Sequence, residues 1–209
     1  MEAKGWDPVG ANPAEGNPYA APAADAIEEE TRSAGVDDAR ADFYVVSLSK
    51  FYILSTSTFG FYTLYWFFAQ FRAQRRSGMR TSPAWAAIFS IFTVHRLFRR
   101  FDRAARDAGL PSSPRAINYA APYIVLALAS QLVRIFGEHN VLANVGSMAL
   151  FVISNVPLAR AQVIVNRIAG DELGESNARL SAANIVTVAL GAIVWLLVVA
   201  GFALPAATN

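Results

Sequence analysis

The chain has 209 residues, enough for one ordinary domain, and it is too apolar for a typical soluble one. Hydrophobic residues make up 54% of it and charged residues only 16%, against about 25% charged residues in soluble domains. It contains no cysteine, which excludes disulfides, thiolate nucleophiles and cysteine-ligated metals. The net charge of +2 conceals acids gathered in residues 1–42 and bases gathered from Arg72 onward. This distribution is typical of the cytoplasmic loops of a membrane protein rather than of a nucleic-acid-binding surface.

Residues 1–42 are rich in Ala, Pro, Gly and acidic side chains and poor in large apolar ones. A segment of this composition cannot bury enough surface to offset the entropy of ordering, so we predict a disordered N-terminal tail. The first apolar run follows this acidic segment, which is not the pattern of a secretory signal peptide. Residues 43–209 are expected to form one helical membrane domain.

Four apolar runs are long enough to cross a membrane, at 51–71, 116–134, 140–159 and 182–204. At 1.5 Å per residue they reach about 27–35 Å, which matches a hydrocarbon core of about 30 Å. Backbone groups in lipid must be satisfied within their own segment, so these runs should be helices. We therefore predict an all-α fold: a polytopic helical membrane protein with about four transmembrane helices.

The stretch 83–108 predicts one amphipathic helix that starts after the N-cap Ser82 and stops at Gly109. Its first part, up to Val94, holds 12 uncharged residues, or about 18 Å of helix, which is too short to span. We expect this part to dip into the cytoplasmic leaflet without crossing. The helix should leave the membrane at His95 and run along its surface.

One face of the second half of this helix is basic. Its members fall within an arc of about 120° at 100° per residue, opposite an apolar face. Such a helix is typical of a segment that contacts an anionic membrane surface. The alternative is a solvated positive face that only sets the topology. The candidate anionic-lipid contacts are Arg96, Arg99, Arg100, Arg103 and Arg106.

Small and polar residues form stripes within the predicted spans, which carry almost no ionisable residue. Small residues let helices approach closely, and interhelical polar hydrogen bonds add about 0.6 kcal/mol each. We favour helix packing over a solute path, because transport paths are usually marked by ionisable groups. The candidate packing residues are Thr56, Gly60, Thr63, Asn144, Ser147, Asn155, Thr187 and Gly191.

The positive-inside rule leaves the side of the tail open. Whether or not 83–94 crosses, thirteen bases fall inside and five outside. Both arrangements put 96–115 and 160–179 in the cytoplasm, and 134–139 and the C-terminus outside. In a third arrangement 51–71 is a hairpin broken at STSTFG, and the tail is cytoplasmic.

No constellation of residues that carries chemistry is found. The two histidines, His95 and His139, are expected on opposite sides of the membrane. The sequence has no H-E-x-x-H, P-loop or G-x-S-x-G pattern. We therefore predict no catalytic residue, no metal and no cofactor, and an enzyme is the least favoured class.

Three segments, KFYILSTSTFGFYTLYWFFAQFRAQRR, SPAWAAIFSIF and NARLSAANIVTVALGAIVWLLVVAGF, resemble a group of small uncharacterised bacterial inner-membrane proteins. The group is a domain of unknown function with a K-F-x-x-L-S…T-x-G-x-Y-x-x-Y-W first segment and an N-x-x…G-x-x-x-W-x-L last helix. The resemblance implies location and architecture but no chemistry. Metal-binding cysteine ribbons in the tails of relatives do not transfer, because this tail has no cysteine. The patterns fall on Lys50, Phe51, Leu54, Ser55, Thr58, Gly60, Tyr62, Tyr65 and Trp66, and on Asn184, Gly191 and Trp195.

These observations favour a non-enzymatic structural, adaptor or lipid-associated component of a bacterial inner membrane. The alternative is a small transporter or channel, as a monomer or an oligomer. Expected partners are membrane lipids, including anionic ones, and a membrane-protein partner or a second copy of the chain. No nucleic-acid partner is expected.

Overall fold

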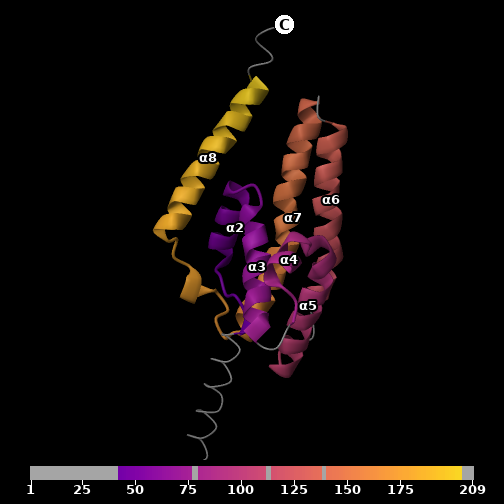
Figure 1. Ribbon diagram of the computed structural model, residues 1–209, viewed down its shortest axis with the longest axis vertical. Helices are drawn as coiled ribbons and strands as arrows, with labels where there is room; N and C mark the ends of the chain where they lie inside the picture. Colours follow the sequence, from indigo (N-terminus) through magenta and orange to yellow (C-terminus); the bar gives the residue numbers. More distant parts are fainter. Residues whose placement is uncertain (1–41, 77–79, 112–113, 138–139, 204–209) are drawn as a thin grey trace, which may run out of the picture. The chain divides into compact units, whose positions relative to one another are not determined.

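The computed structural model describes residues 42–76, 80–111, 114–137 and 140–203, all of which belong to the unit Val36–Asn209. The predicted disordered tail lies almost entirely outside the described residues. Within them, the fold contains seven α-helices and no strand (Figure 1), which confirms the all-α prediction. The α-helices are α2 (Leu48–Ser57), α3 (Phe61–Arg76), α4 (Pro83–Ile88), α5 (Ser90–Asp107), α6 (Ala120–Phe136), α7 (Val141–Ile168) and α8 (Ala182–Ala203), and two short 3₁₀ helices are η1 (Ala116–Tyr119) and η2 (Glu175–Asn177).

Three helical segments are long and apolar enough to cross a membrane: Ala116–Phe136, Val141–Ile168 and Ala182–Gly201. They correspond to three of the four predicted spans. The middle one continues past the predicted end at Ala159, because the exposed side chain of Arg160 lies on the outside of the helix and does not interrupt it. Helices α6 and α7 form an antiparallel pair joined at 137–140, as Figure 1 shows.

The fourth predicted span, 51–71, is wrong as a single helix. Helix α2 ends at Ser57 and α3 begins at Phe61, and the turn between them holds Phe59 and Gly60 at positive φ, 52° and 89°. Thr58 makes the break: its hydroxyl donates to Leu54 O over 2.7 Å and accepts from the α3 backbone N–H of Tyr62 over 2.9 Å. One side chain thus ends α2 and caps α3. The result is a helical hairpin, the third arrangement that the sequence allowed for 51–71.

Helices α2 and α3 lie side by side in opposite directions (Figure 1). The ring of Phe51, near the start of α2, packs edge-on against Tyr62 and Trp66 of α3 at 6.1 and 5.9 Å. Both ends of the hairpin are therefore at the same end of the bundle, and its turn lies beside Phe151, part of the way along α7.

The predicted single helix over 83–108 is also broken, at Phe89. This residue leaves helical geometry at φ −94°, ψ 35°, and separates α4 from α5. The hydroxyl of Thr93 donates to Ala86 O over 2.6 Å and so satisfies a carbonyl left at the end of α4. The exposed side chains around the break are large and apolar: Trp85, Ile88 and Phe92.

The apolar face of α5 packs against protein rather than lipid. Its Val94, Leu97, Phe98 and Phe101 are fully buried, and the helix contacts η1, α7 and α6. The sequence predicted that this helix lies with its apolar face on the membrane surface. In the structure that face packs against the bundle, and the basic face points outward.

An extended segment, 43–47, enters the bundle beneath α3 and α7. Extended backbone has no helical partners, so side chains must satisfy it. Gln70 of α3 bonds both Tyr44 N and Tyr44 O, at 3.2 and 2.9 Å. From α7, Gln162 donates to Tyr44 O at 3.1 Å and Asn166 to Val46 O at 3.0 Å. These amides fix the start of the hairpin to the end of α7.

Candidate functional site: a basic end and three cavities

The basic residues of the described chain gather at one end of the bundle. This end holds the start of α2, the end of α3, α5, the start of α6, the end of α7 and the start of α8. It is opposite the turn at 137–140. Among the described residues only Arg134 lies at the other end, where it donates to Gln131 Oε1 at 2.9 and 3.1 Å.

The five arginines predicted to contact lipid lie on the outer face of α5. Arg96, Arg99, Arg103 and Arg106 are exposed, and Arg100 is half-buried. Because the opposite face is buried in the bundle, these side chains face solvent or membrane. Contact with anionic lipid stays a prediction.

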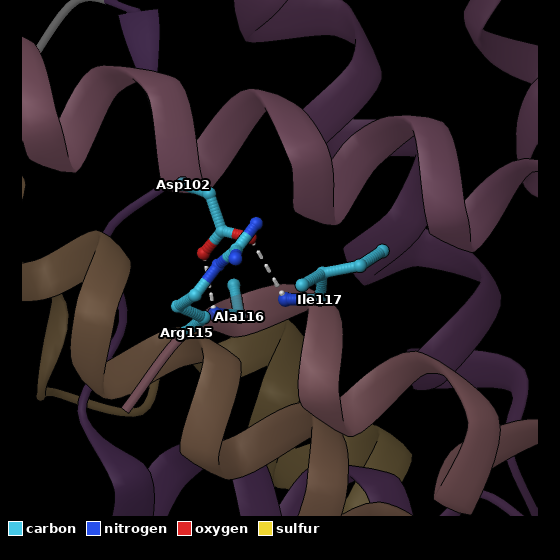
Figure 2. A network of polar contacts seen from close by, with 4 residues as sticks. All are labelled: Asp102, Arg115, Ala116 and Ile117. Atoms are coloured by element: carbon cyan, nitrogen blue, oxygen red, sulfur yellow. Dashed lines mark hydrogen bonds and ion pairs between the residues drawn. The ribbon is translucent and has the colours of Figure 1, made fainter. Parts of the chain in front are cut away.

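Asp102 turns inward from the same helix and caps the start of the next element. Its carboxylate accepts from the backbone N–H of Ala116 at 2.6 Å and of Ile117 at 3.2 Å, and it lies 3.8 Å from Arg115 Nε (Figure 2). Asp102 is only 5% exposed. A carboxylate at a helix N-terminus satisfies free N–H groups and interacts favourably with the helix dipole. Asp102 therefore joins α5 to η1 and α6.

A cavity of about 170 Å³ lies beside Asp102. Three guanidinium groups from separate segments line it: Arg106 of α5, Arg115 before η1 and Arg167 of α7. Arg167 also pairs with Glu172 at 2.9 Å. The two carboxylates offset much of this positive charge, so the cavity is a weaker anion site than its arginines alone indicate.

A larger cleft, about 560 Å³, lies between the hairpin and the start of α8. Lys50 lines it, although the residue is only 6% exposed. Its Nζ donates to Asn177 Oδ1 at 2.7 Å and to Arg179 O at 2.8 Å. Burial lowers the pKa of Lys50, because it removes water from the charged form.

Tyrosines form another wall of this cleft. The hydroxyls of Tyr44 and Tyr62 are 3.3 Å apart, and Tyr65 lies beside them. From the sequence, Lys50 was only the boundary of a predicted span and the first letter of a motif. Its partners come from 177–179, far away in the chain, so no local pattern could reveal them.

A third cavity, about 450 Å³, lies between the hairpin turn, α6 and α7. Thr63 donates to Asn155 Oδ1 at 3.1 Å on one side of it. Phe151 approaches Gly60 so closely that a Cβ there would meet the ring at 3.1 Å. None of the residues that line this cavity is ionisable apart from Tyr123.

The other predicted packing residues fall into different environments. Gly191 of α8 packs directly on the carbonyl of Ser57, so closely that no Cβ would fit. Ser147 is buried and its carbonyl accepts from Ser130 at 3.0 Å, which joins α6 to α7. The carbonyl of Thr56 accepts from the indole of Trp195 in α8 at 3.0 Å.

The side chains of two further predicted packing residues form hydrogen bonds within their own helical segments. The amide of Asn144 donates to Asn140 O of its own helical end, at 3.1 Å. Thr187 is exposed, bonds to Ala183 O within α8 and lines the cleft beside Lys50. Its role in helix packing stays a prediction.

The one histidine among the described residues, His95, lines none of the three cavities. His95 is exposed on α5, and His139 lies outside the described residues. Over the described ranges, no group of acidic and histidine side chains is arranged to hold a metal ion.

Comparison of the chain with models of protein families, with curated proteins and with solved structures found no match. The resemblance to small bacterial inner-membrane proteins stays a prediction.

Proposed function

We propose that the protein is a non-enzymatic, lipid-associated component of a bacterial inner membrane. It binds anionic phospholipids of the cytoplasmic leaflet through the basic end of its bundle. The observation that carries this proposal is the one-sided distribution of arginines around three candidate spans. The bacterial location rests on the sequence resemblance.

The depth of the hairpin supports half-insertion. Its turn lies beside Phe151, ten residues into α7, and so about 15 Å below the outer end of that helix. In a hydrocarbon core of about 30 Å this is near the middle. Non-helical backbone at that depth must be covered by protein, and here the N–H groups of Thr58 and Gly60 bond to Leu54 O and Ser55 O at 3.1 and 3.2 Å.

The segment α4–α5 supports the same arrangement. Ser90 is buried near Tyr123, seven residues into the candidate span Ala116–Phe136, whereas Asp102 caps the start of η1. The segment therefore reaches part of the way into the membrane and returns. Its exposed side chains are apolar up to Phe92 and basic from Arg96 on, which marks the edge of the hydrocarbon core between these two residues.

With 48–76 as a half-inserted hairpin, the charge count is no longer ambiguous. The tail, the end of α3, α5 and 160–179 then share one side. Of the 18 lysines and arginines in the chain, only Arg134 is left on the opposite side. The positive-inside rule assigns the basic side to the cytoplasm, and the C-terminus to the outside.

The basic face should attract an anionic leaflet strongly at low salt. Each base near such a surface contributes about 1 kcal/mol, and the effect falls off within a Debye length of about 8–10 Å. Of the two acids on α5, Asp102 points inward and is already paired. Only the exposed Asp107 opposes the arginines directly, so several kcal/mol should remain.

The test compares thermal stability in nanodiscs of phosphatidylcholine with and without phosphatidylglycerol. Phosphatidylglycerol should raise the melting temperature of the wild type at low salt, and high salt should remove the gain. Replacing Arg96, Arg99 and Arg103 with Gln should reduce the gain by at least half. Arg134→Gln, a charge removal at the opposite end, should leave it unchanged. If neither high salt nor the triple substitution changes the rise in melting temperature caused by phosphatidylglycerol, the proposal is contradicted.

A second candidate function is a channel or transporter for a small uncharged solute. The cavity of about 450 Å³ beneath the hairpin turn favours it, because broken helices near the midplane often line substrate sites. Flux of glycerol or urea into proteoliposomes that is reduced by Thr63→Leu would support this function over the first.

A further inference from the structure

Lys50 is a buried cation whose partners do not neutralise it. Its two hydrogen-bond acceptors, the Asn177 side-chain amide and the Arg179 backbone carbonyl, are both neutral. Within the described residues no carboxylate pairs with it. Burying a charge without a counter-charge is costly, and membrane proteins retain such groups mainly for function. An ammonium has three N–H donors, so one remains for a further partner.

The cleft beside Lys50 is open where α8 separates from the hairpin. The two meet where Gly191 packs on Ser57 and Trp195 bonds to Thr56. Toward its N-terminus, α8 runs away from α2 (Figure 1), and the cleft of about 560 Å³ lies in this region.

Polar donors cluster at the Lys50 end of the cleft. Ser181 and Asn184 line it at the N-terminus of α8, where helix N–H groups and the helix dipole favour anions. Deeper lining residues are Leu54, about one turn of α2 beyond Lys50, and Phe61, which follows the hairpin turn at the far end of α2. The cleft thus offers a cationic site at the membrane edge and an apolar wall toward the membrane interior.

We infer that this cleft binds one anionic phospholipid of the surrounding leaflet, with its phosphate at Lys50 and the start of α8 and an acyl chain along Leu54 and Phe61. A free phosphate ion would leave most of the volume and the apolar wall unused. A phosphodiester headgroup supplies several acceptor oxygens for the donors around Lys50, more than the two of a fatty-acid carboxylate. The inference rests on the proposed function for the half-inserted hairpin, but it concerns a stoichiometric site separate from the arginine face of α5.

The experiment titrates the purified full chain in detergent with phosphatidylglycerol and counts bound lipid by native mass spectrometry. The wild type should bind one lipid tightly. Lys50→Met removes the charge and should weaken this binding at least tenfold. Arg179→Gln is the matched control: it removes a neighbouring exposed charge but keeps the carbonyl that holds Lys50, and it should bind as the wild type does.

A second variant guards against misfolding of Lys50→Met. Thr187→Trp places a large ring into the cleft from an exposed position of α8, and it should displace the lipid while the melting temperature stays near that of the wild type. Unchanged binding of one phosphatidylglycerol by both variants overturns the inference.

Three further ligands test the headgroup. Phosphatidylcholine should bind more weakly than phosphatidylglycerol, and oleate and inorganic phosphate weakest. Equal binding of oleate, or of inorganic phosphate, contradicts the phosphodiester assignment.

The triple arginine variant separates the two proposals. It should keep the single tight lipid while losing the salt-dependent stabilisation by anionic membranes. If it keeps that stabilisation too, the proposed function fails and the Lys50 site stands. If it loses the tight lipid, the site is not independent of α5 and the inference fails.

Discussion

The capping of η1, which leads into α6, by Asp102 of α5 gives the sharpest stability prediction. Asp102→Ala removes both acceptors of the Ala116 and Ile117 N–H groups, which lie at 2.6 and 3.2 Å. Loss of an N-cap costs about 0.5–2 kcal/mol, and a buried donor left without a partner about 1–3 kcal/mol. Ala116 is fully buried, whereas Ile117 is half-buried, so only the first donor bears the full penalty. The expected loss is about 2–4 kcal/mol.

The ion pair with Arg115 adds little to this loss of stability. The Nε atom of Arg115 is 3.8 Å from the Asp102 carboxylate, and the arginine side chain is 56% exposed. Such solvent-exposed pairs contribute about 0–1 kcal/mol. Asp102→Asn keeps one acceptor oxygen and should therefore lose about half as much stability as Asp102→Ala.

Thermal unfolding in detergent, followed by circular dichroism, measures the effect. For chains of 150–250 residues, 1 kcal/mol corresponds to about 2–4 °C, so Asp102→Ala should melt roughly 5–15 °C below the wild type. Asp107→Ala is the matched control, since Asp107 is exposed at the end of the same helix and should change little. Equal melting temperatures for the two variants would refute the capping role.

The remaining predictions concern packing and topology. Gly191→Ala should lower the melting temperature, because the added Cβ would collide with the backbone of Ser57 in α2. Gly201→Ala in the same helix is the control and should be neutral, since a Cβ there meets nothing within 4 Å. Equal melting temperatures for the two variants would mean that α8 does not pack on α2 at Gly191. The chain has no native cysteine, so single cysteines report topology. Ser49→Cys and Glu175→Cys should resist an impermeant maleimide in intact cells, and Asn209→Cys should react. Labelling of Ser49→Cys from outside would exclude the half-inserted hairpin.

The sequence predicted the three long helices because length and hydropathy determine whether a segment can span. The same two quantities cannot separate one span from a hairpin of two half-spans. For 51–71 the deciding residues are Thr58, whose hydroxyl serves both helices, and Gly60, which takes the φ of 89°. Polar residues and a glycine in mid-span signalled this alternative, but they also fitted helix packing.

The arginine face of α5 was predictable because helical periodicity is local. Whether the apolar face of α5 contacts lipid or protein was not predictable, since both environments favour the same apolar side chains. The Lys50 site depends on the carbonyl of Arg179 and the amide of Asn177, which folding alone brings to α2. A hydropathy plot places such a lysine at the edge of a membrane span but does not show which residues it contacts.

One polar stripe of α7 contacts several parts of the bundle. The polar stripe predicted on it ended at Asn155, because the helix was expected to end at Ala159. The helix continues to Ile168, and the stripe continues with it to Gln162 and Asn166, both fully buried. At about 100° per residue, the four positions Ser147, Asn155, Gln162 and Asn166 fall within an arc of roughly 100°.

The positions on that arc meet three different parts of the bundle. Ser147 meets α6, Asn155 meets the hairpin through Thr63, and the two inner amides hold α3 and the extended segment 43–47. In lipid, apolar side chains give little preference among helix neighbours, so polar contacts select them. A chain whose helices break between α2 and α3 and again at Phe89 has more helix ends to fix than a bundle of unbroken helices. The polar arc of α7 fixes the ends of the hairpin, through Thr63 of α3 and the segment 43–47 before α2.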